Sequence, residues 1–506
     1  MPVGFSSAAR NLFLLGASGA DSVTNFFLEL DKSSTGYTQW RPQGIHYNAS
    51  DQTYINLLQT ASSGYDLTLE KVQQDGTIDW TSNAFNTNNT NNSSLSVTSL
   101  HVDSNGDILA AGQVGSPDNQ PVVLKYTNGG SLTWSSTTSS ANVTYQSLTS
   151  DSNNNYYACG HTPSTGFNND SVAFVEKFDV NGNPGWGKSA FMLGRNVKLS
   201  DIAANSRGEV VAVGSLEDDS NDKGYIVKID TGTGSVLWDR TLDFIGTQDI
   251  FIYEVFIDNN DQIYVAGQVG GFGEAFLIKY TPEGNIIWQK QTQAMESGTY
   301  GKYFRPVGLR SDGETEQTVV LHDVFDVDLA FETGEEMENY LSLSKYSKDG
   351  SLVWRRNIQK NSNDSIYYGN LDADPSFYYT NFKKFSSGHN KYIFGKVSTS
   401  GNGLGDFSYD DGSTDDIEYT ISDVTDTIGR LTDGSVRNDT SDLVAYPFSA
   451  NKIVFDDLAT HVSNKRRQMD SADSFEYSGS PAIRPADFQE LNLLGENVSD
   501  RIWTDT

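Results

Sequence analysis

The chain of 506 residues contains a single cysteine, Cys159, so it cannot form an internal disulfide. Basic residues are also scarce: 35 lysines and arginines stand against 66 aspartates and glutamates, which gives a formal net charge of −31. Such a surface repels nucleic acids and anionic membranes, and we expect neither as a partner. No run approaches the roughly 20 apolar residues of a membrane-spanning helix. The stretch Asn11–Gly16 is too short for an export signal.

Aromatic and turn-forming residues are plentiful by contrast. The chain has 26 phenylalanines, 25 tyrosines and 8 tryptophans, which supply ample material for a packed core. It also has 46 glycines, and asparagine, serine, threonine and aspartate are frequent. These residues are typical of tight turns between many short strands. The composition therefore favours an all-β fold.

A repeat runs through most of the chain. Seven tryptophans recur, mostly 50–54 residues apart, and a glycine lies four residues before each of them. In six of these seven units a lysine lies nine or ten residues before the tryptophan, and Glu29 takes the comparable place in the first unit. A fixed period of this length indicates a repeat architecture rather than a series of unrelated domains. The tryptophans are Trp40, Trp80, Trp134, Trp186, Trp238, Trp288 and Trp354.

The unit at 250–288 shows the structure of the repeat most clearly. It predicts four short strands at 251–258, 262–267, 275–280 and 285–290, joined by turns rich in asparagine and glycine. The strands are nearly continuous apolar runs, so each sheet must be covered on both faces. A β-propeller meets this requirement, because every four-stranded blade lies between two neighbours. A glycine that ends the second strand of most units would let backbones crowd near the axis.

The units predict the domain organisation. Seven repeats are clear and an eighth, at 376–432, is degenerate because its tryptophan is missing, so we predict seven blades and a further eighth. Residues 1–432 form the predicted propeller, and residues 433–506 form a short irregular C-terminal tail. The eight units lie at about 2–40, 43–80, 96–134, 144–186, 197–238, 250–288, 304–354 and 376–432.

The pattern of strand, glycine, lysine-bearing strand and Gly-x-x-x-Trp resembles the bacterial β-propeller repeat family known as SBBP. The tail segment Phe455–Thr460, followed by Asn464-Lys465-Arg466-Arg467, is similar to segments of virion proteins of tailed phages that infect marine cyanobacteria. The first resemblance implies a propeller without known catalysis. The second implies a structural protein that is assembled in the host cytoplasm and released by lysis.

Catalytic chemistry leaves little trace in the sequence, and we predict no catalytic, cofactor-binding or metal-binding residues. Asp230–Trp238 resembles the docking motif of eight-bladed quinoproteins, but those enzymes often need a vicinal cysteine pair. Asp103–Asp107 has the alternating oxygens of a calcium loop, yet a hairpin turn explains it better. We expect the carboxylates of 323–328 to face solvent. Paired carboxylates for glycan cleavage would come from different blades, so that alternative stays open.

These observations favour a non-catalytic structural or adhesion component of a phage virion, associated with its tail or a fibre. Expected partners are other virion proteins and a host-surface glycan or receptor, contacted by the loops at 281–304 and 323–340. The basic cluster Lys465, Arg466 and Arg467 is the predicted assembly contact, and it makes the tail a candidate anchor. A bacterial surface or secreted binding module is the alternative, followed by a quinoprotein-like or glycan-cleaving enzyme.

Overall fold

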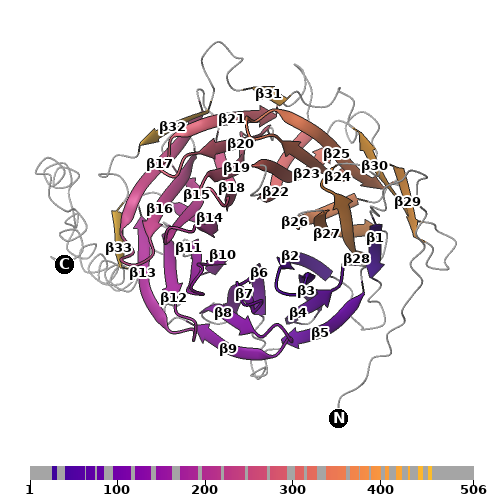
Figure 1. The fold of residues 1–506 in the computed structure, drawn as a ribbon, viewed down its shortest axis with the longest axis horizontal. Helices are drawn as coiled ribbons and strands as arrows, with labels where there is room; N and C mark the ends of the chain where they lie inside the picture. The colour runs from indigo at the N-terminus through magenta and orange to yellow at the C-terminus, as the bar shows by residue number, and fades with distance from the viewer. Residues whose placement is uncertain are drawn as a thin grey trace, which may run out of the picture.

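The computed structural model places seven antiparallel sheets around a central axis, as in a seven-bladed β-propeller (Figure 1). The structure describes residues 26–30, most of 40–400, and five short strands between residues 405 and 457. The predicted propeller is therefore confirmed. Within the described part of the chain no helix is long and apolar enough to cross a membrane.

Six blades consist of four consecutive strands each. Blade 1 holds β2 (Trp40–Asn48), β3 (Thr53–Ser62), β4 (Gly64–Val72) and β5 (Ile78–Ala84), and blade 2 holds β6 (Leu95–Val102), β7 (Ile108–Val114), β8 (Gln120–Tyr126) and β9 (Leu132–Thr137). Blade 3 holds β10 (Thr144–Ser150), β11 (Tyr156–His161), β12 (Ala173–Phe178) and β13 (Pro184–Phe191), and blade 4 holds β14 (Val197–Ala204), β15 (Glu209–Leu216), β16 (Lys223–Asp230) and β17 (Val236–Phe244). Blade 5 holds β18 (Ile250–Ile257), β19 (Ile263–Val269), β20 (Glu274–Tyr280) and β21 (Ile286–Thr292), and blade 6 holds β22 (Lys302–Asp312), β23 (Gln317–Asp326), β24 (Glu338–Tyr346) and β25 (Leu352–Lys360).

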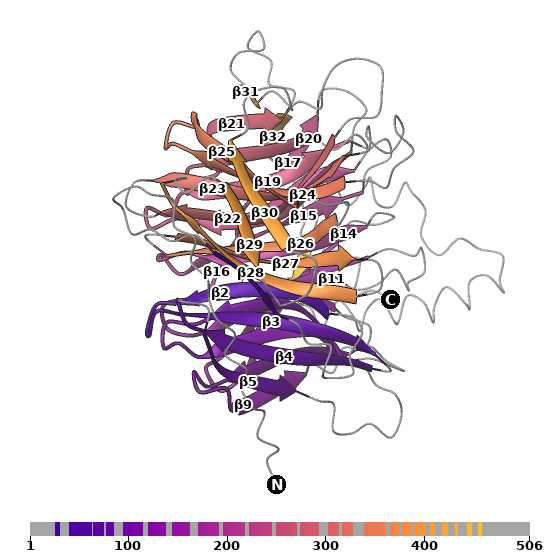
Figure 2. The same cartoon turned by 90° about the vertical axis from the view of Figure 1, so that its right-hand side faces the viewer.

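Blade 7 joins the two ends of the ring. Its inner strands are β26 (Ser365–Ala373), β27 (Phe377–Ser386) and β28 (His389–Ser398), and its outer strand is β1 (Phe26–Leu30), which pairs with β28 from Phe26↔Lys396 to Leu30↔Tyr392. The first and the degenerate eighth repeat thus share one sheet, and the described residues form seven blades with no separate eighth one. Figure 2 shows the seam where β26–β28 of this blade meet β2–β5 of blade 1.

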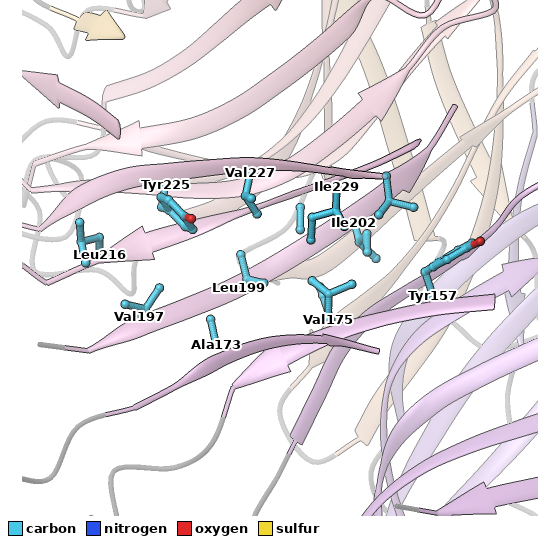
Figure 3. Packing of buried hydrophobic residues seen from close by; sticks show 13 residues of the cluster. Tyr157, Ala173, Val175, Val197, Leu199, Ile202, Leu216, Tyr225, Val227 and Ile229 are labelled. Carbon is cyan, nitrogen blue, oxygen red and sulfur yellow. The ribbon is translucent and has the colours of Figure 1, made fainter. Parts of the chain in front are cut away.

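Each blade packs face to face on its neighbours. The cluster in Figure 3 combines Tyr157, Ala173 and Val175 of blade 3 with Val197, Leu199 and Val227 of blade 4, and all of them are buried. Clusters of the same kind lie between other neighbouring blades. This arrangement explains why the strands are apolar on both faces. Cys159 is buried in β11, as expected for a small apolar side chain.

The Gly-x-x-x-Trp motif is a contact between blades. The indole of Trp134 in blade 2 donates its N–H to Val180 O of blade 3 at 3.1 Å. It also lies on Gly182 of that blade, where an added Cβ would come within 2.7 Å of the indole. Trp80, Trp238 and Trp288 each meet the motif glycine of the next blade in the same way. The motif thus has a structural role in holding neighbouring blades together.

The recurring lysine is a second such contact. Lys228 of blade 4 donates to Pro282 O of blade 5 at 2.8 Å, and Lys345 of blade 6 donates to Thr399 O of blade 7 at 2.9 Å. Lys396 takes the same place in blade 7 and donates to Gln74 O of blade 1 at 3.3 Å, which closes the circle. Lys71, Lys125, Lys177 and Lys279 complete the set. The sequence alone did not reveal Lys396, because no tryptophan follows it.

The aspartate-rich turns are hairpin turns, as predicted. Asp103 Oδ1 accepts hydrogen bonds from the backbone N–H groups of Asn105 and Asp107 at 2.9 and 3.0 Å. Asp151 and Asp258 make the same pair of contacts in their own turns. Side-chain oxygens thereby satisfy turn amides that have no partner in the sheet.

The segment after residue 400 adds strands to the outer edges of four blades. β30 (Ile417–Asp423) pairs with β25 and carries β29 (Gly405–Tyr409), and β31 (Leu431–Asp433) pairs with β21. β32 (Leu443–Pro447) pairs with β17, and β33 (Val454–Asp457) pairs with β13. We call β30–β33 the outer strap; Figure 1 shows β31–β33 at the rim. Two strands of the predicted tail, β32 and β33, therefore extend blades 4 and 3, and β31 spans the predicted boundary at residue 432, which stays a prediction.

Candidate functional site: the central channel

A channel of about 850 Å³ runs through the centre of the ring and is lined by the innermost strand of every blade. These strands are β2, β6, β10, β14, β18, β22 and β26. Each of them has a β-bulge near its middle, for example between Leu199 and Asp201 in β14 and between Ile252 and Glu254 in β18. A bulge bends a strand and redirects its side chains. Seven repeated bulges therefore help to determine which side chains line the channel.

The bulges also explain the glycine that ends the second strand of most repeats. At Gly112 on β7 an added Cβ would lie 2.0 Å from Ser96 O of the innermost strand, and Gly160 and Gly214 show the same close approach to their inner strands. No other residue fits there without moving a backbone. In the degenerate unit at 376–432 the glycine that the repeat pattern predicts at the end of a second strand is Gly395, and it lies on the third strand of blade 7, β28, instead.

Five polar side chains and one phenylalanine ring link six of the seven blades around the channel. The guanidinium of Arg310 donates to Asp372 Oδ1 at 2.6 Å, and His46 Nδ1 lies 3.5 Å from the other carboxylate oxygen. The rings of His46 and His101 are 4.9 Å apart, and His101 Nε2 is 2.8 Å from Ser150 Oγ. Arg310 also lies over the ring of Phe256 at 6.0 Å. We call these six residues the channel girdle.

Electrostatics fix the protonation of the girdle. Burial lowers the pKa of His46, with the charge of Asp372 opposing this only in part, and burial lowers the pKa of His101 further. Burial would raise the pKa of Asp372, but the Arg310 guanidinium and His46 hold it below its usual value. At neutral pH the girdle therefore contains one ion pair and two uncharged imidazoles.

Two carboxyl groups from neighbouring blades, those of Asp201 and Glu254, directly follow the bulges of β14 and β18 and line the channel. Asp201 Oδ1 accepts a hydrogen bond from Ser147 at 2.6 Å, and Oδ2 accepts one from the Val255 backbone at 2.8 Å, so Asp201 ties blades 3, 4 and 5 together. Burial raises the pKa of Glu254 to about 8, and the charge of Asp201 adds to this effect. Burial likewise raises the pKa of Asp201, which its hydrogen bonds oppose.

Arg305 differs from the other channel cation. Its side chain is exposed and lines the channel, whereas the Arg310 guanidinium is paired with Asp372. The Arg305 guanidinium lies over the ring of Tyr253, 5.0 Å from its centre. The Tyr253 hydroxyl in turn lies 3.3 Å from Gln268 Oε1. Together Arg305 and Tyr253 place a positive charge and an aromatic ring on the channel wall.

The sequence did not single out these channel residues, because they come from several repeats that only the closed ring brings together. One prediction near them is wrong: Asp323 does not face solvent. It lies on β23, lines the channel, is 5 % exposed, and accepts a hydrogen bond from the Gly369 backbone of blade 7 at 3.1 Å. The buried pairing explains the difference, because β23 is covered on both faces by its neighbours.

Other predicted sites are described only in part. Lys465, Arg466 and Arg467 lie outside the described residues. So do most of the loops between β21 and β22 and between β23 and β24, where host contacts are expected. In the described part of the chain no three histidine, cysteine, aspartate or glutamate side chains gather in a way that could hold a metal ion.

Comparison with known proteins adds only a likeness of fold. No family model matches the chain, and no curated protein matches its sequence. Among solved structures, an ulvan lyase of a new polysaccharide lyase family is 13 % identical over 69 % of this chain and 90 % of its own, with a TM-score of 0.42. The sialidase of Trypanosoma rangeli is 12 % identical over 71 % of this chain and 55 % of its own, with a TM-score of 0.35.

A protein of unknown function from Dyadobacter fermentans is 8 % identical over 71 % of this chain and 96 % of its own, with a TM-score of 0.40. At such values none of these proteins lends its activity to this chain. A closed propeller with a polar channel has the form of a binding module, and the function must be argued from the residues themselves.

Proposed function

We propose that this chain is a non-catalytic structural and adhesion component of a phage virion, associated with its tail or a fibre. The observation that carries the proposal is the ring of contacts between blades. Tryptophans, lysines and channel carboxylates such as Asp201 and Asp372 bind the next blade. A ring held in this way is a rigid platform, and rigid platforms are suited to presenting binding loops. The similarity of the 455–467 segment to virion proteins of cyanobacterial phages supports the same proposal.

The experiment is immunogold labelling of purified phage particles with an antibody against this chain, supported by mass spectrometry of the same particles. We expect discrete label on the tail or fibres. Label on the capsid would keep the protein structural but remove the adhesion role. Particles that lack the protein would overturn the virion proposal and favour a bacterial surface or secreted binding module, with partners other than virion proteins.

A glycan-cleaving enzyme is the second candidate, because Asp201 and Glu254 bring two carboxyl groups from neighbouring blades to the channel. Glycosidases use such pairs, one protonated and one ionised. Both oxygens of Asp201 are engaged in contacts between blades, which argues for a structural role. Release of new reducing ends from host-surface polysaccharide by the purified protein, lost in Glu254→Gln, would establish the enzyme instead.

A further inference from the structure

We propose that the central channel binds a carboxylated saccharide and that Arg305 pairs with its carboxylate. This inference rests on the proposed binding function and names the ligand class of the channel. The channel volume of about 850 Å³ lies within the usual range for ligand pockets, roughly 300–1,000 Å³. It is therefore large enough for a short oligosaccharide.

Arg305 is the cation that the fold leaves available. Within the described residues its guanidinium makes no hydrogen bond or ion pair; it lies over the face of Tyr253, 5.0 Å from the ring centre, and interacts electrostatically with Glu254. By contrast, Arg310 is paired with Asp372 at 2.6 Å. Arg207, in the turn between β14 and β15 outside the channel, is paired with Asp261 at 2.7 Å. A guanidinium offers parallel N–H groups that match the two oxygens of a carboxylate. The Tyr253 ring holds it in place over the channel wall.

The surrounding charges select the kind of anion. Asp201, Asp323 and Asp372 also line the channel, so a polyanion such as a nucleic acid or a polyphosphate would be repelled. A single carboxylate on an otherwise uncharged sugar meets Arg305 with the least repulsion. Serine, threonine, glutamine and asparagine side chains along the inner strands supply partners for sugar hydroxyls. The channel chemistry therefore fits a uronic acid or a similar acidic sugar.

Glu254 makes binding depend on pH. The charged groups that act on it are Asp201 on β14 and Arg305 and Arg310 on β22, and its pKa of about 8 leaves it uncharged at neutral pH. Raising the pH from 7 to 9 ionises Glu254 and adds a negative charge to the channel near Arg305. A carboxylate ligand is then repelled, so its affinity falls as the pH rises.

The test is isothermal titration calorimetry of the full chain with an aldotriouronic acid, a trisaccharide that carries one uronic acid carboxylate, with its methyl ester, and with a neutral trisaccharide that carries one sulfate in place of the carboxylate. We expect the acid to bind and the ester and sulfated sugar to bind on the order of 10- to 100-fold more weakly. Arg305→Gln should lose a similar factor for the acid, and Arg305→Lys should lose less. Arg207→Gln is the matched control, because Arg207 lies outside the channel, and it should leave binding unchanged.

The pH arm uses Glu254→Gln. The wild-type affinity for the acid should fall about 3- to 10-fold between pH 7 and pH 9, and the variant should lose this dependence. Equal binding of acid and ester, preference for the sulfated sugar, or undiminished binding by Arg305→Gln with an unchanged melting temperature would each overturn the inference.

The two proposals fail separately. A protein found on virions that binds none of the three sugars would retain the virion role and lose the channel ligand. Binding of the acid through Arg305 by a protein missing from the particles would retain the channel ligand and lose the virion role.

Discussion

Single residues keep neighbouring blades at their spacing. Gly130 lies in the turn between β8 and β9 with a φ of +79°, and an added Cβ would come within 2.9 Å of Trp80 Cε3. A side chain there meets both a backbone conformation that L-residues rarely adopt and an aromatic ring of the preceding blade. The adjacent Gly129 has neither restriction, since its nearest neighbour would be Thr127 Oγ1 at 3.7 Å.

We therefore expect Gly130→Ala to lower the free energy of unfolding by about 1–3 kcal/mol. Gly129→Ala should change it by less than about 0.5 kcal/mol. Urea unfolding followed by tryptophan fluorescence measures both. Equal effects of the two substitutions would show that the Trp80 contact does not limit this position.

The ion pair of the channel girdle gives a second test at the residue scale. Asp372→Asn leaves Arg310 in the channel wall without its carboxylate partner, and we expect a loss of about 3 kcal/mol in the free energy of unfolding. Glu283→Gln is the control, because Glu283 lies 3.8 Å from Arg207 with both side chains exposed, and should cost less than about 0.5 kcal/mol. Chemical denaturation measures the free energy of unfolding of both variants. If Asp372→Asn unfolds with the same free energy as the wild type, other groups must compensate the charge of Arg310.

At the scale of strands, the sequence predicted the elements within a repeat but not the pairing of distant strands. The strands of the unit at 250–288 were predictable because each is a short apolar run bounded by a turn such as Asp258–Gln262. The seam was not, because β1 and β28 are far apart in sequence and nothing local to Phe26–Leu30 says which sheet it joins. The channel site could not be predicted from the sequence for the same reason. Arg305 and Tyr253 come from different repeats, and only the closed ring brings them together.

The outer strap gives the prediction at this scale. Deletion of residues 431–506 removes β31, β32 and β33 but leaves four strands in each blade that they cover. We expect the propeller to fold, and the outer-edge amides of β13, β17 and β21 to exchange with solvent on the order of 10-fold faster. Amides of β9 are the internal control, since no strap strand pairs with it in the described structure. Unchanged exchange in β13, β17 and β21 would contradict the pairing.

Charge is a property of the whole molecule. With a formal net charge of −31, the folded ring is destabilised by repulsion among its own carboxylates. At 0.1 M salt, the repulsion between exposed charges more than about 10 Å apart is largely screened. Raising sodium chloride from 10 to 300 mM should therefore raise the melting temperature by about 2–4 °C. Potassium chloride at equal ionic strength should give the same shift; a flat response in calorimetry would mean that the surface charges are already compensated.

The pairing of β1 with β28 also determines when the ring of blades can close during synthesis. Phe26 pairs with Lys396, 370 positions later in the chain, so the ring stays open while nearly all of the propeller is being synthesised. At about 5–20 residues per second, β1 waits on the order of 20–70 s for β28 to leave the ribosome. Blades 1–6 can stack in order during that time, each on the blade before it. Closure of the ring is then the capture of the first described strand, β1, by the last blade to be synthesised.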